Sequence, residues 1–145
     1  MNSALSICFT ALLISGCGGV DLSDENELRR LLEEAVSKED LMSKEIAGGT
    51  QVVRKMDNQP YEGWMVDHYE KGRLGSLEYI RKGVPSGPFR IWHPNGIPQS
   101  EGFLREGMEH GVWTLWFENG KKREMKIFEE GAMEGPYAWW LPTDN

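Results

Sequence analysis

The chain has 145 residues, of which 39% are hydrophobic and 27% charged, with 17 glycines and 2 cysteines. This length suits one ordinary domain and excludes a large multidomain enzyme. The 16 Lys and Arg residues against 23 Asp and Glu give a net charge of -7, the wrong sign for binding nucleic acid or an anionic lipid surface. An aromatic content of 10% excludes disorder along the whole chain.

The first residues are typical of an export signal. Residues 1–16 carry no charged side chain and include an apolar run from Ile7 to Ile14, followed by the small residues Ser15 and Gly16. The run is too short to span a bilayer, and an apolar core of roughly 7–15 residues before small residues is the pattern of a secretory signal peptide. Lys and Arg, which usually precede such a core, are absent from residues 1–6. We expect residues 1–16 to be cleaved off.

Cys17 follows this signal directly, and Ile14-Ser-Gly-Cys17 resembles the lipobox of bacterial lipoproteins. The resemblance implies cleavage before Cys17 and acylation, typically with palmitate, of its thiol and new amino group. Gly18 in the next position resembles lipoproteins that are passed on to an outer membrane. Two or more acyl chains anchor stably, because each buried methylene contributes about 0.8 kcal/mol. The alternative is that residues 7–14 form a buried strand or helix start and that Cys17 is a plain thiol.

A charged segment from Asp21 to Glu45 comes next, and its apolar residues recur at intervals of three and four. They are Leu28, Leu31, Leu32, Ala35 and Val36, with Met42 and Ile46 further on. This spacing predicts an amphipathic helix with Ser23 or Asp24 as its N-cap, ending near residue 47 before Gly48-Gly49. The heptad pattern does not persist, so a coiled coil is not expected. We expect residues 17–50 to hold the acylated cysteine, a tether and a helix that spaces or caps the first strands.

A repeat of 24 residues spans residues 61–145, with units that start near residues 61, 85, 109 and 133. Three series of glycines keep this interval: Gly63, Gly87, Gly111 and Gly135; Gly72, Gly96 and Gly120; and Gly83, Gly107 and Gly131. Other side chains follow the same register, in columns such as Met65, Phe89, Trp113 and Tyr137, or His68, Trp92, Trp116 and Trp140. Three independent series indicate that one structural unit recurs.

Each unit is predicted to be one β-hairpin. Residues 111–117 have the aromatic and β-branched content of a strand, residues 118–120 contain the hairpin signal Asn119-Gly120, and a return strand runs to about Phe128. Asn and Gly are expected at the centre of such a turn because both tolerate positive φ. Stacked hairpins predict a mainly β domain over residues 51–145, an antiparallel meander in a single sheet preceded by a short helix.

The pattern Gly-x-aromatic-x-x-Trp-aromatic-x-Asn-Gly-Lys at residues 111–121 resembles the MORN repeat variant family, and the likeness covers 85 of 145 residues. Residues 51–64 resemble the segment that such proteins place before the first unit. His68 in a tryptophan column and Pro98 after a turn depart from the pattern. Proteins with these repeats are often described as antitoxins of the YwqK type, which implies neutralisation of a toxin by direct binding.

The sequence carries no common catalytic signature. It has no phosphate-binding glycine loop, no Gly-x-Ser-x-Gly motif and no His-Glu-x-x-His motif. The three histidines, His68, His93 and His110, stand at different positions of the hairpin and do not predict a metal site. We therefore expect no catalytic residues, no enzyme activity, no cofactor and no bound metal.

The column Trp92, Trp116 and Trp140 is the candidate binding surface, because exposed aromatic patches mark interaction sites. The alternative is that the column forms the core of a thin sheet.

The leading hypothesis is a membrane-anchored, non-enzymatic binding or scaffold module of the cell envelope, with a protein or a cell-wall glycan as partner and no nucleic acid. The other hypotheses are an antitoxin-like protein and a structural spacer. The basic run at 121–123 suggests phosphate or lipid-headgroup binding, and the strand at 136–141 suggests an edge-to-edge homodimer.

Overall fold

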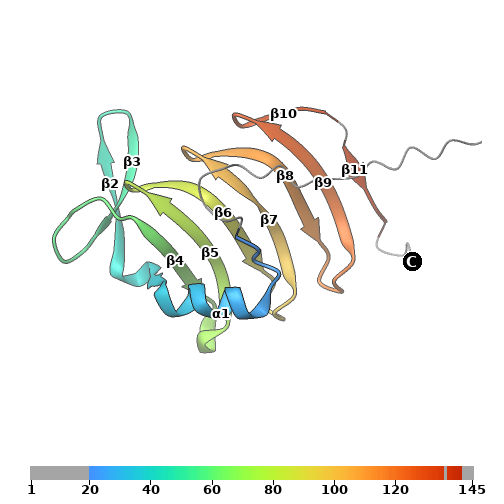
Figure 1. The fold of residues 1–145 in the computed structure, drawn as a ribbon, viewed down its shortest axis with the longest axis horizontal. Coiled ribbons are helices and arrows are strands. Elements are labelled where there is room, and N and C mark those ends of the chain that lie inside the picture. Colours follow the sequence, from blue (N-terminus) through green and yellow to red (C-terminus); the bar gives the residue numbers. More distant parts are fainter. Residues whose placement is uncertain (1–19, 136, 142–145) are drawn as a thin grey trace, which may run out of the picture.

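The computed structural model describes residues 20–135 and 137–141. It confirms the predicted fold class, a mainly β chain with one short helix near the N-terminus and a mostly antiparallel meander (Figure 1). The elements are α1 (Glu25–Glu34), β1 (Val36–Ser37), η1 (Lys38–Asp40), β2 (Leu41–Ile46), β3 (Gly49–Arg54), β4 (Gly63–His68), η2 (Glu70–Gly72), β5 (Leu74–Arg81), β6 (Val84–Trp92), β7 (Pro98–Arg105), β8 (Met108–Trp116), β9 (Lys122–Glu129), β10 (Ala132–Met133) and β11 (Ala138–Trp139).

The large sheet follows the repeat. Strands β4 to β9 are antiparallel neighbours in chain order, so each 24-residue unit contributes one hairpin: β4 with β5, β6 with β7, and β8 with β9. The short β1 runs parallel to β4 at one edge, while β10 and β11 both pair with β9 at the other. Strands β2 and β3 form a separate hairpin that projects at the β4 end (Figure 1).

The helix begins where the sequence predicts but ends earlier. Asp24 is its N-cap, and its Oδ1 accepts a hydrogen bond of 2.8 Å from the backbone N–H of Glu27. The predicted end near residue 47 is wrong, because α1 stops at Glu34. The chain then turns extended so that Val36 can pair with β4 and Leu41 can be buried at the start of β2. Pairing and burial outweigh the helical spacing in residues 35–46.

The two ends of each hairpin unit use different turns. In the Asn-Gly turns only the glycine has positive φ, as at Gly120 with φ 82°. Asn119 contributes instead through its side chain, which accepts a hydrogen bond of 3.0 Å from the backbone N–H of Lys121. The expectation of positive φ at both Asn and Gly is therefore wrong. Paired positive φ, typical of type I′ turns, occurs at the other end of the units, at Lys82-Gly83, Glu106-Gly107 and Glu130-Gly131.

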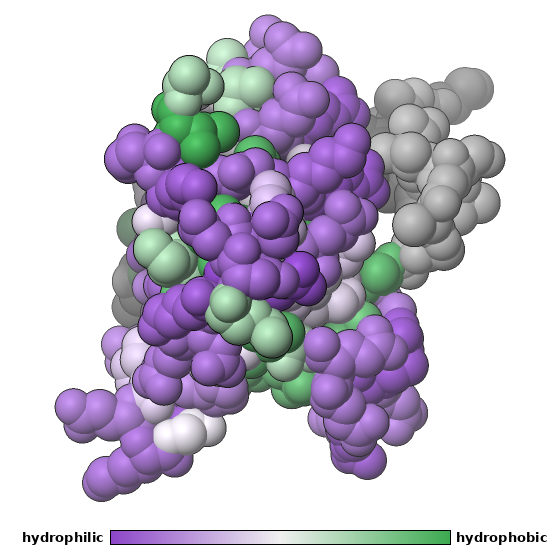
Figure 2. Space-filling view, turned by 90° about the vertical axis from the view of Figure 1, so that its left-hand side faces the viewer, coloured by the Kyte–Doolittle hydropathy of each residue, from purple (hydrophilic) through white to green (hydrophobic). Residues whose placement is uncertain are grey.

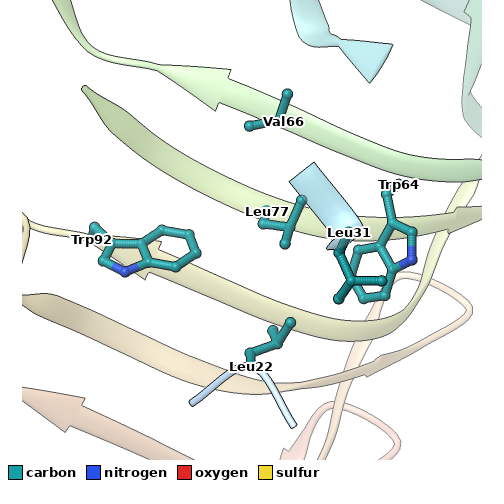
Figure 3. Close-up of a cluster of buried hydrophobic side chains, with 6 residues drawn as sticks. All are labelled: Leu22, Leu31, Trp64, Val66, Leu77 and Trp92. Atoms are coloured by element: carbon teal, nitrogen blue, oxygen red, sulfur yellow. The ribbon is translucent and has the colours of Figure 1, made fainter. Parts of the chain in front are cut away.

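The sheet has two faces with separate small cores. We call the face on which α1 packs the helix face, where Leu22 and Leu31 meet the sheet. Figure 3 shows that cluster, which consists of Leu22, Leu31, Trp64, Val66, Leu77 and Trp92. The opposite face, here called the hairpin face, buries Leu41 of β2 with Tyr61, Met65 and Ile80. Seen from the β2–β3 end, the surface is mostly hydrophilic with hydrophobic residues in small separate groups (Figure 2).

Candidate functional site

The predicted lipid attachment site, Cys17, lies outside the described residues. Val20, the first described residue, already packs against the helix-face cluster, and Leu22 is fully part of it. Only Gly18 and Gly19 separate Cys17 from this packed chain. The segment that follows Gly19 therefore belongs to the folded domain.

Arg90 fixes this N-terminal segment to the sheet. Its side chain is buried on the helix face of β6, and Nη1 donates a hydrogen bond to the backbone carbonyl of Leu22. Nη2 lies 2.5 Å from Oε2 of Glu101 on the neighbouring β7, and the guanidinium carbon lies 5.7 Å from the ring centroid of Trp92. Sequence reasoning missed Arg90. The sequence did contain a sign of its role: Arg90 is a charged residue at the repeat position that Val66 and Thr114 occupy in the adjacent units.

The structure separates the three tryptophans of the predicted binding surface. Trp92 is only 5% exposed and belongs to the core, in the same buried cluster as Leu22 and Leu31. Trp116 and Trp140 are half-buried on the same face at its other end. The carbonyl of Trp116 lies 3.0 Å from Nε2 of His93. The candidate surface therefore loses Trp92 and keeps Trp116 and Trp140.

Two other aromatic residues are far more exposed. Tyr137 and Trp139 are 47% and 60% exposed and lie on the hairpin face beside β9. The Nζ of Lys126 is 5.7 Å from the ring centroid of Tyr137 and 2.7 Å from Oε2 of Glu124. The hydrogen bond from Lys126 lowers the pKa of Glu124, which keeps this pair ionised. The signal in the sequence was the Trp139-Trp140 pair, whose members must point to opposite faces of a strand.

A polar cavity of about 320 Å³ lies on the sheet beside η1 and the β4–β5 hairpin. Nζ of Lys38 lies 2.9 Å from Oδ2 of Asp67 at this cavity, and their hydrogen bond raises the pKa of Lys38 and lowers that of Asp67. Glu78 also lines it, next to Phe89 on the adjacent strand. Burial raises the pKa of the Glu78 carboxyl, which has no ion pair among the described residues. The cavity therefore places one desolvated carboxyl beside a neutralised ion pair.

Within residues 20–135 and 137–141, no group of three or more His, Cys, Asp or Glu residues is placed to hold a metal ion. In the same part of the chain, no helix is long and apolar enough to cross a membrane. Two of the histidines contact other parts of the sheet: Nδ1 of His110 lies 3.5 Å from Oε2 of Glu129, and Nε2 of His93 lies 3.0 Å from the carbonyl of Trp116.

Comparison with known proteins finds no matching family model, no matching curated protein and no matching solved structure. The likeness to the MORN repeat variant therefore rests on the repeat in this chain alone. It stays a prediction from the sequence.

Proposed function

We propose that the chain is a lipid-anchored, non-enzymatic binding module of the bacterial cell envelope, built on repeats of the MORN variant type, that presents an aromatic sheet surface to a protein partner. The lipobox-like residues 14–17 support the anchor. The exposed pair Tyr137 and Trp139 is the observation that carries the binding role.

The physical character of this pair suits protein recognition. Large aromatic side chains supply much contact area at a small entropy cost, and Trp and Tyr are enriched among the residues that dominate binding energy. Pairing of Ala138 with Met125 of β9 holds the strand that carries Trp139. Lys126 and Glu124 place charges of both signs around the rings, as in the polar rim of an interface. A partner would therefore meet a pre-formed aromatic patch with a charged border.

The test compares Trp139→Ala with Met56→Ala, which removes another exposed apolar side chain just after β3, and β3 lies at the opposite end of the molecule from β11 (Figure 1). Cells that express each form are treated with an amine-reactive cross-linker, and the adducts of the membrane fraction are identified by mass. We expect one adduct shared by wild type and Met56→Ala and at least a fivefold loss in Trp139→Ala, which corresponds to about 1 kcal/mol. An adduct unchanged in Trp139→Ala contradicts the assigned surface. If wild type gives no specific adduct, protein binding itself is contradicted.

A further inference from the structure

The helix face changes character between β6 and β7. All sheet residues in the cluster under α1 belong to β4, β5 and β6. The face continues over β7–β9, as a row of successive cross-strand partners shows: Leu77, Arg90, Glu101, Thr114 and Met125. Partners in such a row share one face of a sheet, and so do residues two positions along each strand.

This row identifies the apolar side chains that the described helix does not cover. They are Phe103, Val112, Trp116, Met125, Ile127 and Trp140, here called the β7–β9 patch. Phe103 and Val112 are 37% and 42% exposed, and the other four are half-buried. Exposed apolar residues that gather on one face of a sheet mark an interaction site.

Two carboxylates beside the patch lie close to basic side chains. Glu101 lies against Arg90, and Glu129 lies 4.0 Å from Arg105 and 3.5 Å from His110. The acidic character of the chain as a whole, with its net charge of -7, is therefore muted at this surface. A surface with an apolar centre, half-buried tryptophans and carboxylates near basic side chains suits the boundary between headgroups and acyl chains, where Trp is enriched.

The position of the chain's N-terminal segment indicates which surface meets this patch. Leu22 of this segment lies on the helix face (Figure 3), and Arg90 of β6 donates a hydrogen bond to its backbone carbonyl. Three residue steps separate Cys17 from Val20, and they span at most about 10 Å. Neighbouring strands are about 4.8 Å apart, so β7–β9 lie within about 15 Å of β6. An anchor on Cys17 is therefore confined to the side of the sheet that carries the patch.

We propose that the β7–β9 patch lies against the lipid bilayer that holds the Cys17 acyl chains, so that the domain is seated on the membrane and not suspended from it. This inference rests on the proposed anchor at Cys17. It also orients the molecule, because Tyr137 and Trp139 lie on the opposite face and point away from the lipid. The bilayer and the partner then occupy different faces of one sheet.

The test places an environment-sensitive NBD label on each face of the mature protein, which begins at the acylated Cys17. Val112→Cys labels the patch, Phe103→Cys labels it a second time, and Met133→Cys is the matched control at an exposed apolar residue on the hairpin face. Each labelled form is placed in phosphatidylcholine vesicles with and without doxyl-labelled lipid. We expect the labels at 112 and 103 to lose about half of their fluorescence with doxyl lipid, because interfacial groups lie within roughly 5–10 Å of the headgroup boundary. The label at 133 should stay unchanged.

The outcomes separate this inference from the proposed function. If the proteins sediment with vesicles but the labels at 112 and 103 are no more quenched than the label at 133, the anchor stands and the seating on lipid is overturned. A label that is shielded from water but not quenched by doxyl lipid also overturns it, in favour of a second copy of the chain. If no form sediments with vesicles, the anchor fails and the inference fails with it.

Discussion

Arg90 on β6 and Glu101 on the adjacent strand β7 are cross-strand neighbours on the helix face, with 2.5 Å between Nη2 and Oε2. The same guanidinium holds the carbonyl of Leu22, so one buried cation joins both strands of one repeat unit to the segment that precedes α1. Removal of such a group leaves its partners desolvated without compensation. The position of the N-terminal segment on the sheet therefore depends on this contact.

We expect Arg90→Ala to lower the free energy of unfolding by about 2–4 kcal/mol, because the variant strands the Leu22 carbonyl and leaves Glu101 partly buried without its cation. Arg105→Ala is the matched control. Its 4.0 Å contact with Glu129 is solvent-exposed, so its loss should cost less than about 1 kcal/mol. Urea unfolding of both variants measures the difference. Equal losses in the two would contradict the role given to Arg90.

Replacing a buried tryptophan by alanine should lower the free energy of unfolding more than replacing an exposed one. Trp92→Ala opens a cavity in the cluster that contains Leu22 and Leu31, and we expect it to cost about 3–5 kcal/mol of unfolding free energy. Trp139→Ala removes an exposed ring and should cost less than about 1 kcal/mol. Thermal and urea unfolding are suitable measurements. A Trp92→Ala variant as stable as wild type would show that Trp92 is not a core residue.

The turn glycines differ in how closely the chain surrounds them. Gly83 and Gly107 both have φ near 80°, a conformation that costs an L-residue about 1–2 kcal/mol. A Cβ at position 83 would lie 2.7 Å from the backbone oxygen of Val52, whereas at 107 the nearest atom is 3.7 Å away on Val84. We expect Gly83→Ala to be the more destabilising by about 1–3 kcal/mol. Equal unfolding free energies for Gly83→Ala and Gly107→Ala would contradict this prediction, because they would show that β3 moves away from position 83 without loss of stability.

The raised pKa of Glu78 predicts a pH-dependent stability. Because burial favours the neutral form in the folded chain, the folded state binds a proton more tightly than the unfolded state. Wild type is therefore stabilised as pH falls through the folded pKa toward the ordinary value of 4.5, and loses that stability as pH rises. Glu78→Gln lacks this dependence, so its advantage over wild type should grow from pH 4.5 to pH 7. Urea unfolding across this range that gives a constant difference would contradict the prediction.

The repeat made the meander predictable, because glycine and aromatic columns at 24-residue intervals encode one hairpin per unit. The end of α1 was not predictable, since residues 35–46 have helical spacing and the competing partners, such as β4, are distant in sequence. The burial of Trp92 was not predictable for the same reason, because Leu22 of the same cluster is distant in sequence. A column of equal side chains in the sequence becomes unequal in the fold because only the β4–β6 end is covered by the N-terminal segment.

Lipid anchoring at Cys17 is the claim on which the proposed function and the seating on the membrane both depend. The most direct measurement is membrane fractionation of wild type beside Cys17→Ala and Cys8→Ala, with the mass of each mature N-terminus determined. We expect wild type and Cys8→Ala in the membrane fraction with residues 1–16 removed and residue 17 acylated, and Cys17→Ala without the acyl mass. Wild type that is soluble, full-length and unmodified would contradict the anchor.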